Sequence, residues 1–237
     1  MKIVMAQGWV WRVGFPPEPW AWAGWRWAGS EGRFNGRWDS LTAKLYRTVY
    51  AGESLYACFV ELLAPLRPDE FLAEELDEIL ENEEDAKEWP TVTPGHIDID
   101  EWCGKRLAGS AQLAGRFVDI TASATVAELY SHFIEQARVI HGLKDFDASA
   151  LKNPEQRSLT QSVSEFLWKK SEKGTSNFCD GINFRSRHGD DLVLWAIFER
   201  PEDGERSRLV TDIQTVPVDR EMPELVAAIK QLGLITV

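Results

Sequence analysis

Strand-like and helix-like segments follow one another irregularly in this sequence, and their order constrains the fold more than any other feature. Apolar alternation predicts strands over residues 2–15, 45–52, 116–121, 181–186, 192–199 and 208–216, and a short strand at the end of the chain. Helical periodicity predicts helices over residues 54–64, 69–88, 125–140, 153–170 and 223–232. Because no regular β-α-β repeat is present, we expect an α+β fold. At 237 residues, the chain fits one compact domain over residues 1–237.

Two of these helices have start signals. Thr125 and Glu128 have the spacing of a capping box. Asn153 followed by Pro154 predicts an N-cap with proline at the first helical position.

The net charge of −12 is concentrated in one segment. Residues 69–88 contain eleven acidic residues and one lysine, whereas residues 1–50 contain seven basic residues and three acidic ones. The acidic segment is typical of an amphipathic helix with a solvated face. The basic first quarter suits an anionic ligand, and the acidity of the whole chain argues against nonspecific binding to nucleic acid.

The sequence favours a cytoplasmic protein without a metal site. No apolar run approaches the ~20 residues of a membrane-spanning helix, and the first residues lack the apolar core of a signal peptide. The three cysteines, Cys58, Cys103 and Cys179, are far apart and odd in number. They therefore indicate neither a disulfide framework nor a zinc site.

Seven of the eleven tryptophans lie in the first 38 residues, within a segment rich in proline and glycine. Two interpretations are open for this cluster. The indoles either pack beneath a long ordered loop, which is the commoner use of tryptophan, or stack on a ligand that contains a ring.

Glu61 is the only charged residue between Ser54 and Ala64, in a helix that is apolar on nearly every side. Burial of an uncompensated carboxylate is costly, so Glu61 is expected to be paired, hydrogen-bonded or functional. It is either half of a structural ion pair with one of the early arginines or a catalytic group.

Ser186 shares a strand face with Ile182 and Phe184, which predicts a hydroxyl that points inward at the end of the strand. No GxSxG motif surrounds it, so a serine hydrolase is not indicated. Guanidinium groups suit diphosphate oxygens, but spacing alone selects none of the early arginines, Arg12, Arg26, Arg33, Arg37 and Arg47. The nucleotide-binding motifs GxGxxG and GxxxxGK[ST] and the zinc-binding motif HExxH are absent.

Four segments together resemble the RES-domain family, which is named for an arginine, a glutamate and a serine. They are WRVG, GRFNGRWD, VYAGESLYACFVE and GINFRSRHGDDLVLWAIFE, in this order along the chain. The set is fairly specific, whereas each segment alone is a weak signal. The resemblance covers residues 9–67 and 155–199 well, and residues 69–115 are interpreted as an insertion that contains the acidic helix.

The resemblance implies a fold similar to that of ADP-ribosyltransferases and an enzyme that cleaves the nicotinamide–ribose bond of NAD+, with water or phosphate as acceptor. NAD+ is then a substrate, and no cofactor is required. Matched to the family motif, the catalytic residues are Glu61, Ser186 and Arg37, and the NAD+-binding residues are Arg12, Arg37, Tyr50 and, less strongly, Arg33. In these roles Glu61 stabilises positive charge on the ribose, Ser186 hydrogen-bonds the substrate, Arg12 and Arg37 hold the diphosphate, and Tyr50 packs on nicotinamide or ribose.

The resemblance also implies a growth-inhibiting toxin with a helix-turn-helix antitoxin as partner, and it leaves homo-oligomerisation open. Two other functions remain possible for the same site. One is transfer of ADP-ribose to a protein, and the other is NAD+ binding without catalysis.

Overall fold

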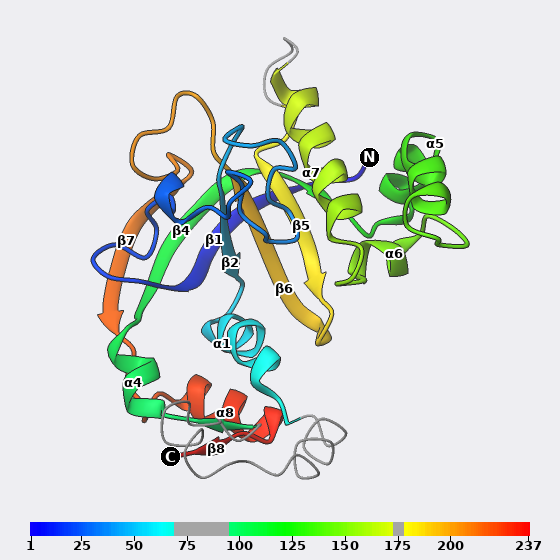
Figure 1. Cartoon of the computed structure of the whole chain (residues 1–237). Helices are drawn as coiled ribbons and strands as arrows, with labels where there is room; N and C mark the ends of the chain where they lie inside the picture. The colour runs from blue at the N-terminus through cyan, green and yellow to red at the C-terminus, as the bar shows by residue number, and fades with distance from the viewer. Residues whose placement is uncertain (69–94, 173–177) are drawn as a thin grey trace.

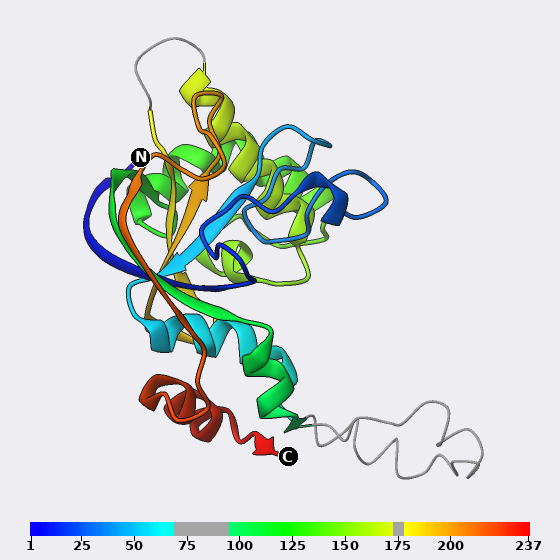
Figure 2. The same cartoon turned by 90° about the vertical axis from the view of Figure 1, so that its left-hand side faces the viewer.

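The computed structural model describes residues 1–68, 95–172 and 178–237, which form a curved six-stranded sheet with helices around it (Figures 1 and 2). This arrangement confirms the predicted α+β fold. The acidic helix expected over residues 69–88 lies outside the described residues.

The sheet has the strand order β1-β2-β6-β5-β4-β7, and β1 pairs with β4 as well as with β2. These pairings join β1, β2, β6, β5 and β4 into a closed ring, although β1 and β2 share only the pair Trp11 and Gly52. The pairing of β4 with β5 is parallel, and the others in this sheet are antiparallel. The strands are β1 (Ile3–Gly14), β2 (Thr48–Gly52), β4 (Leu107–Asp119), β5 (Gly181–Ser186), β6 (Gly189–Phe198) and β7 (Val210–Pro217). A small separate sheet pairs β3 (His96–Ile97) with β8 (Ile235–Thr236).

The helices form two groups at different sides of the sheet (Figure 1). Beside β5 lie α5 (Ser123–Val139), α6 (Ala148–Lys152) and α7 (Arg157–Glu172). At the lower end of the sheet lie α1 (Leu55–Leu63), α4 (Ile99–Gly104) and α8 (Pro223–Leu232). Two 3-10 turns, η1 (Trp25–Trp27) and η2 (Ala64–Leu66), follow β1 and α1. None of the helices among the described residues is long and apolar enough to span a membrane.

Two apolar cores lie on the two faces of the sheet. One joins the sheet to the helices and includes Phe59, Leu129 and Val163. The other includes Trp20 and Trp22, which are 1% and 5% exposed and belong to the loop after β1. These two indoles therefore pack beneath the loop, as in the first interpretation of the tryptophan cluster, whereas Trp27 is 71% exposed.

Helix α1 agrees closely with the sequence prediction. The side chain of Ser54 caps it by accepting a hydrogen bond from the N–H of Ala57 at 3.1 Å. Its buried residues are Ala57, Cys58, Phe59, Val60 and Leu63. The helix was expected to be buried on nearly every side. This expectation is wrong for the side that carries Glu61, which is half-buried, and Leu62, which is exposed.

The two predicted helix starts are wrong. Helix α5 begins at Ser123, before the predicted cap. Thr125 and Glu128 bind the N-terminal segment instead. The N–H of Lys2 donates a hydrogen bond to Thr125 Oγ1, and the terminal amino group contacts Glu128. Asn153 is the C-cap of α6, and α7 begins four residues later, at Arg157. The predicted capping box fails because both of its side chains make tertiary contacts with the N-terminal segment. The predicted N-cap at Asn153 fails because this residue ends the short helix α6.

The predicted strand over residues 116–121 is the end of a longer strand, β4, which starts at Leu107 and pairs with β1, β5 and β7. Residues 107–115, the last part of the predicted insertion, therefore belong to the main sheet. The small residues of this part, such as Ala108, Gly109 and Ala111, lack the β-branched pattern that predicts a strand.

Close backbone packing fixes β5, the strand that ends at Ser186. A Cβ atom at Gly181 would lie 2.0 Å from the carbonyl oxygen of Ala196 on β6. Replacement of Gly181 by Ala is therefore expected to lower the free energy of unfolding by about 2–3 kcal/mol, measured by denaturant titration. Gly8→Ala is the matched control, because a Cβ there meets nothing within 4 Å. Equal stabilities of the two variants would contradict this account.

Candidate active site

Glu61 and Ser186, which are far apart in the sequence, meet where α1 approaches the end of β5. Ser186 Oγ donates a hydrogen bond to Glu61 Oε1 and accepts one from the backbone N–H of His188 at 2.9 Å. Ser186 is only 1% exposed. Because its proton is directed to Glu61, the hydroxyl fixes the orientation of the carboxylate.

The alternative of a structural ion pair for Glu61 is wrong for the part of the chain that the structure describes. No arginine nitrogen there lies within 4.0 Å of its carboxylate. The carboxylate instead faces a cavity of about 250 Å³.

The cavity beside Glu61, here called the Glu61 cavity, is rich in positive charge. Arg37, Arg157, Arg187 and His188 line it together with Glu61. Tyr50 and Phe184 form its aromatic part. Three guanidinium groups around one carboxylate leave an excess of positive charge, which suits a ligand with an anionic group close to a neutral or cationic one.

Burial and repulsion by neighbouring positive charges lower the pKa values of Arg37 and His188. Burial lowers the pKa of Arg37, the carboxylate of Glu61 opposes that shift, and Arg157 and Arg187 add to it. Burial likewise lowers the pKa of His188 against the opposing effect of Glu61. The histidine is therefore mostly neutral at pH 7, while the arginines remain charged.

The hydroxyl of Tyr50 donates one hydrogen bond and accepts another within the protein. It donates to Asp39 Oδ1 at 2.9 Å and accepts from the backbone N–H of Trp38 at 2.9 Å. Burial and the neighbouring Asp39 carboxylate raise the pKa of Tyr50 well above its usual value. Tyr50 lines the Glu61 cavity, and its hydroxyl ties the loop that contains Arg37 to β2.

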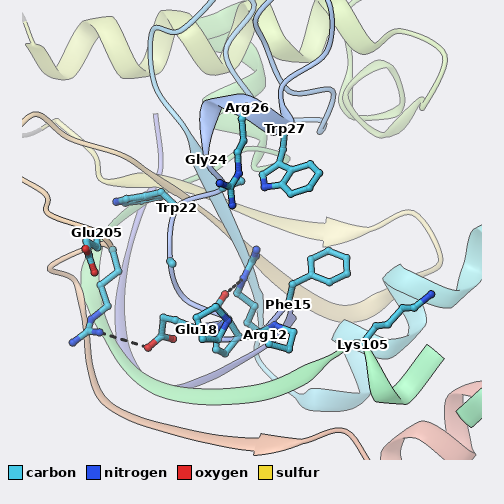
Figure 3. Close-up of a pocket in the computed structure, with 15 residues that line it drawn as sticks. Arg12, Phe15, Glu18, Trp22, Gly24, Arg26, Trp27, Lys105 and Glu205 are labelled. Carbon is cyan, nitrogen blue, oxygen red and sulfur yellow. Dashed lines mark hydrogen bonds and ion pairs between the residues drawn. The ribbon is translucent and has the colours of Figure 1, made fainter. Parts of the chain in front are cut away.

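Arg12 and Arg33 lie outside the Glu61 cavity. Arg12 donates from Nε to the carbonyl of Pro19 at 2.5 Å and from Nη1 to the carbonyl of Tyr50 at 2.8 Å, and it lines a second, larger cavity (Figure 3). Arg33 is bound to Glu31 and Gln161 and lines neither cavity. Of the predicted residues, the structure brings together Glu61, Ser186, Arg37 and Tyr50.

Sequence reasoning missed Arg157, Arg187 and His188. The last two directly follow Ser186 in the turn between β5 and β6, so their position beside the predicted serine was a usable signal. Arg157 had no such signal, because only the packing of α7 brings it to the cavity. Among the described residues, no group of three or more His, Cys, Asp and Glu side chains is placed to hold a metal ion.

Comparison with known families places the chain in a defined class. Residues 10–219 match the model of the RES domain, and the chain belongs to this family. Comparison with curated proteins gives no significant match. Among solved structures, the chain is similar to one in the crystal structure of the M. tuberculosis MbcT–MbcA toxin–antitoxin complex, with 16% identity, a TM-score of 0.46, and coverage of 97% of this chain and 91% of that one.

Proposed function

We propose that this protein cleaves the nicotinamide–ribose bond of NAD+, with water or phosphate as acceptor. The observation that supports this function is the Glu61 carboxylate, which Ser186 orients at the wall of a cavity lined by three arginines. A fixed carboxylate suits a substrate that develops positive charge on a sugar ring, and the arginines suit its phosphates.

In the proposed reaction, the bond between ribose C1′ and the nicotinamide nitrogen breaks, and its electron pair leaves with nicotinamide. Positive charge then develops on the ribose, where Glu61 stabilises it or holds the 2′-hydroxyl. An oxygen of water or phosphate forms the new bond to C1′, and the acceptor's proton, where it has one, passes to solvent. Preorganised electrostatics of this kind supply several kcal/mol to a transition state.

Ser186 takes a different role from the one that the family resemblance implies. Its hydroxyl binds Glu61 and the backbone of His188, and it does not line the Glu61 cavity. We therefore assign Ser186 as a positioning residue for Glu61 and not as a direct substrate contact.

Ser186→Ala is accordingly expected to lower kcat by about tenfold, because Glu61 loses one fixed hydrogen bond worth about 1.5 kcal/mol. KM for NAD+ should change little, since the hydroxyl does not face the substrate. Steady-state kinetics separate the two parameters, with Ser131→Ala, an exposed serine on α5, as control. A higher KM with an unchanged kcat would instead show that Ser186 contacts the substrate.

The direct test of function is incubation of the purified protein with NAD+, with and without inorganic phosphate. Release of nicotinamide in the absence of any protein acceptor supports the proposal, and the ribosyl product identifies the acceptor. Nicotinamide release only with a protein acceptor indicates an ADP-ribosyltransferase. NAD+ binding without turnover indicates a member of the family that has lost catalysis.

We further infer that NAD+ depletion in the cytoplasm makes the protein a growth-inhibiting toxin controlled by a helix-turn-helix antitoxin. This inference follows from the family resemblance. Induced expression in bacteria, with and without the product of the neighbouring gene, tests it through growth and cellular NAD+ content. Normal growth together with an unchanged NAD+ level would contradict it.

A further inference from the structure

We propose that Asp39 and Gln161 are positioning residues, which hold Gly36 from two sides and thereby fix Arg37 in the Glu61 cavity. Neither side chain lines the cavity, so both act through Arg37 and not on the substrate. The inference rests on the proposed function for its choice of ligand. Its evidence comes from the hydrogen bonds around the loop that contains Arg37.

Asp39 is a buried carboxylate that no ion pair neutralises. It is 5% exposed, and none of the ion pairs in the described part of the chain includes it. Its Oδ2 accepts a hydrogen bond from the N–H of Gly36, and its Oδ1 accepts one from the hydroxyl of Tyr50. Burial raises the pKa of Asp39, and these hydrogen bonds oppose that shift. A carboxyl group buried at such a cost, and bound to the residue directly before Arg37, points to a role in the site.

The glycine before Arg37 leaves room for this carboxylate. A Cβ atom at Gly36 would lie 2.5 Å from Asp39 Oδ2 and 2.5 Å from the hydroxyl oxygen of Tyr50. Any larger residue at this position would therefore displace the carboxylate or the hydroxyl. Gly36 and Asp39 thus form a close-fitting pair at the start of the segment that carries Arg37.

Gln161 holds the other side of Gly36 from helix α7. It is 0% exposed, and its Nε2 donates to the carbonyl of Gly36 at 3.1 Å and to that of Phe34 at 3.4 Å. Its Oε1 accepts a hydrogen bond from Arg33 Nη1 at 2.8 Å. Both ends of this buried amide are therefore bound to the loop that leads to Arg37.

The same side of α7 also carries Arg157 and Ser164. Residues 157, 161 and 164 are spaced by four and three, so their side chains lie on one face of the helix. Arg157 lines the Glu61 cavity, and Ser164 Oγ donates to the carbonyl of Trp38 at 2.6 Å. Helix α7 thus supplies one cation of the cavity and binds the carbonyls on both sides of Arg37. These contacts set the position of Arg37 relative to Arg157.

Asp39→Asn tests the first of these contacts. Asparagine keeps the size of the side chain but replaces one acceptor oxygen by an amide NH2 group, so Gly36 or Tyr50 loses its acceptor. A guanidinium group binds phosphate oxygens through aligned hydrogen bonds, so its affinity depends on its orientation. We expect the Kd for NAD+, measured by calorimetry, to rise about tenfold, the effect of losing one hydrogen bond to a charged group. Gln161→Leu should act in the same direction.

A double-mutant cycle shows whether Asp39 acts through Arg37. In an Arg37→Ala background, Asp39→Asn should change the Kd for NAD+ by less than about twofold, because the group that it positions is gone. A residue that only stabilises the fold has the same effect with or without Arg37. Equal effects of Asp39→Asn in the two backgrounds would therefore overturn the proposal, as would no effect in either.

Asp203→Asn is the matched control. Asp203 also accepts two backbone N–H groups of its own loop, those of Arg200 at 2.9 Å and Arg208 at 3.0 Å, but it lines neither cavity. Its replacement should leave the affinity for NAD+ unchanged. Thermal melting checks that each variant is folded.

Hydrogen exchange of the ligand-free protein, followed by mass spectrometry, tests the positioning without NAD+. Residues 34–40 should exchange about tenfold faster in Asp39→Asn and in Gln161→Leu than in the unmodified protein or in Asp203→Asn. Unchanged exchange overturns the proposal, and the proposed function then still stands if NAD+ is cleaved. If exchange is faster but the unmodified protein neither binds nor cleaves NAD+, the positioning of Arg37 stands and the proposed function fails.

Discussion

Glu61→Gln is expected to lower kcat for NAD+ cleavage by about 10²–10³, the usual cost of removing a key electrostatic group from an active site. Glutamine keeps the size of the side chain and an acceptor oxygen for Ser186, and it removes only the negative charge. Because that charge acts mainly on the transition state, the affinity for NAD+ should change little.

The stability of this variant separates catalysis from a structural role. Removal of the carboxylate from a buried ion pair lowers the free energy of unfolding by about 3–5 kcal/mol. The structure contains no such pair among the described residues, because the hydrogen bond to Glu61 comes from a neutral hydroxyl. The melting temperature of Glu61→Gln should therefore remain close to that of the unmodified protein.

Single-turnover NAD+ cleavage and thermal melting on the same preparation test both expectations. Glu53→Gln is the matched control, since Glu53 is exposed just before α1 and is not part of the cavity. A Glu61→Gln protein that melts much earlier, yet cleaves NAD+ at the normal rate when folded, would exclude Glu61 as the catalytic group.

Arg37→Ala should weaken NAD+ binding by about 2–4 kcal/mol, or roughly 30- to 1,000-fold in Kd, the range for loss of a desolvated charged contact. Arg37 is half-buried in the Glu61 cavity, and burial already lowers its pKa, so its charge is poorly solvated before a ligand binds. Arg37→Lys should restore binding only in part, since an ammonium group lacks the planar fork of guanidinium.

Arg33→Ala is a close control for this experiment. Both arginines lie in the segment GRFNGRW, but Arg33 is held by Glu31 and Gln161 outside either cavity. It should therefore affect NAD+ affinity much less. Unchanged affinity in a folded Arg37→Ala protein would remove Arg37 from the site. Arg12→Ala is a poorer test, because it also leaves the carbonyls of Pro19 and Tyr50 without their donor.

The sequence by itself determined those features that depend on local pattern. Alternation along β5 predicted that Ser186 points inward, and it is buried. The apolar helix after Ser54 predicted α1 and its cap, and the lone Glu61 identified the carboxylate of the candidate site. These features follow from side-chain periodicity and from the cost of burying a charge, both of which a single segment reveals.

Only the tertiary structure decided which of these side chains share a cavity. It placed Arg37 with Glu61 and separated Arg12 into the larger cavity, although both arginines were expected to bind the same diphosphate. It also brought Arg157 to Glu61 from a helix almost a hundred residues away along the chain. It also brought the hydroxyl of Ser186, an expected substrate contact, within hydrogen-bonding distance of Glu61. Local periodicity specifies which face of an element is buried, but which elements meet depends on the packing of the whole chain.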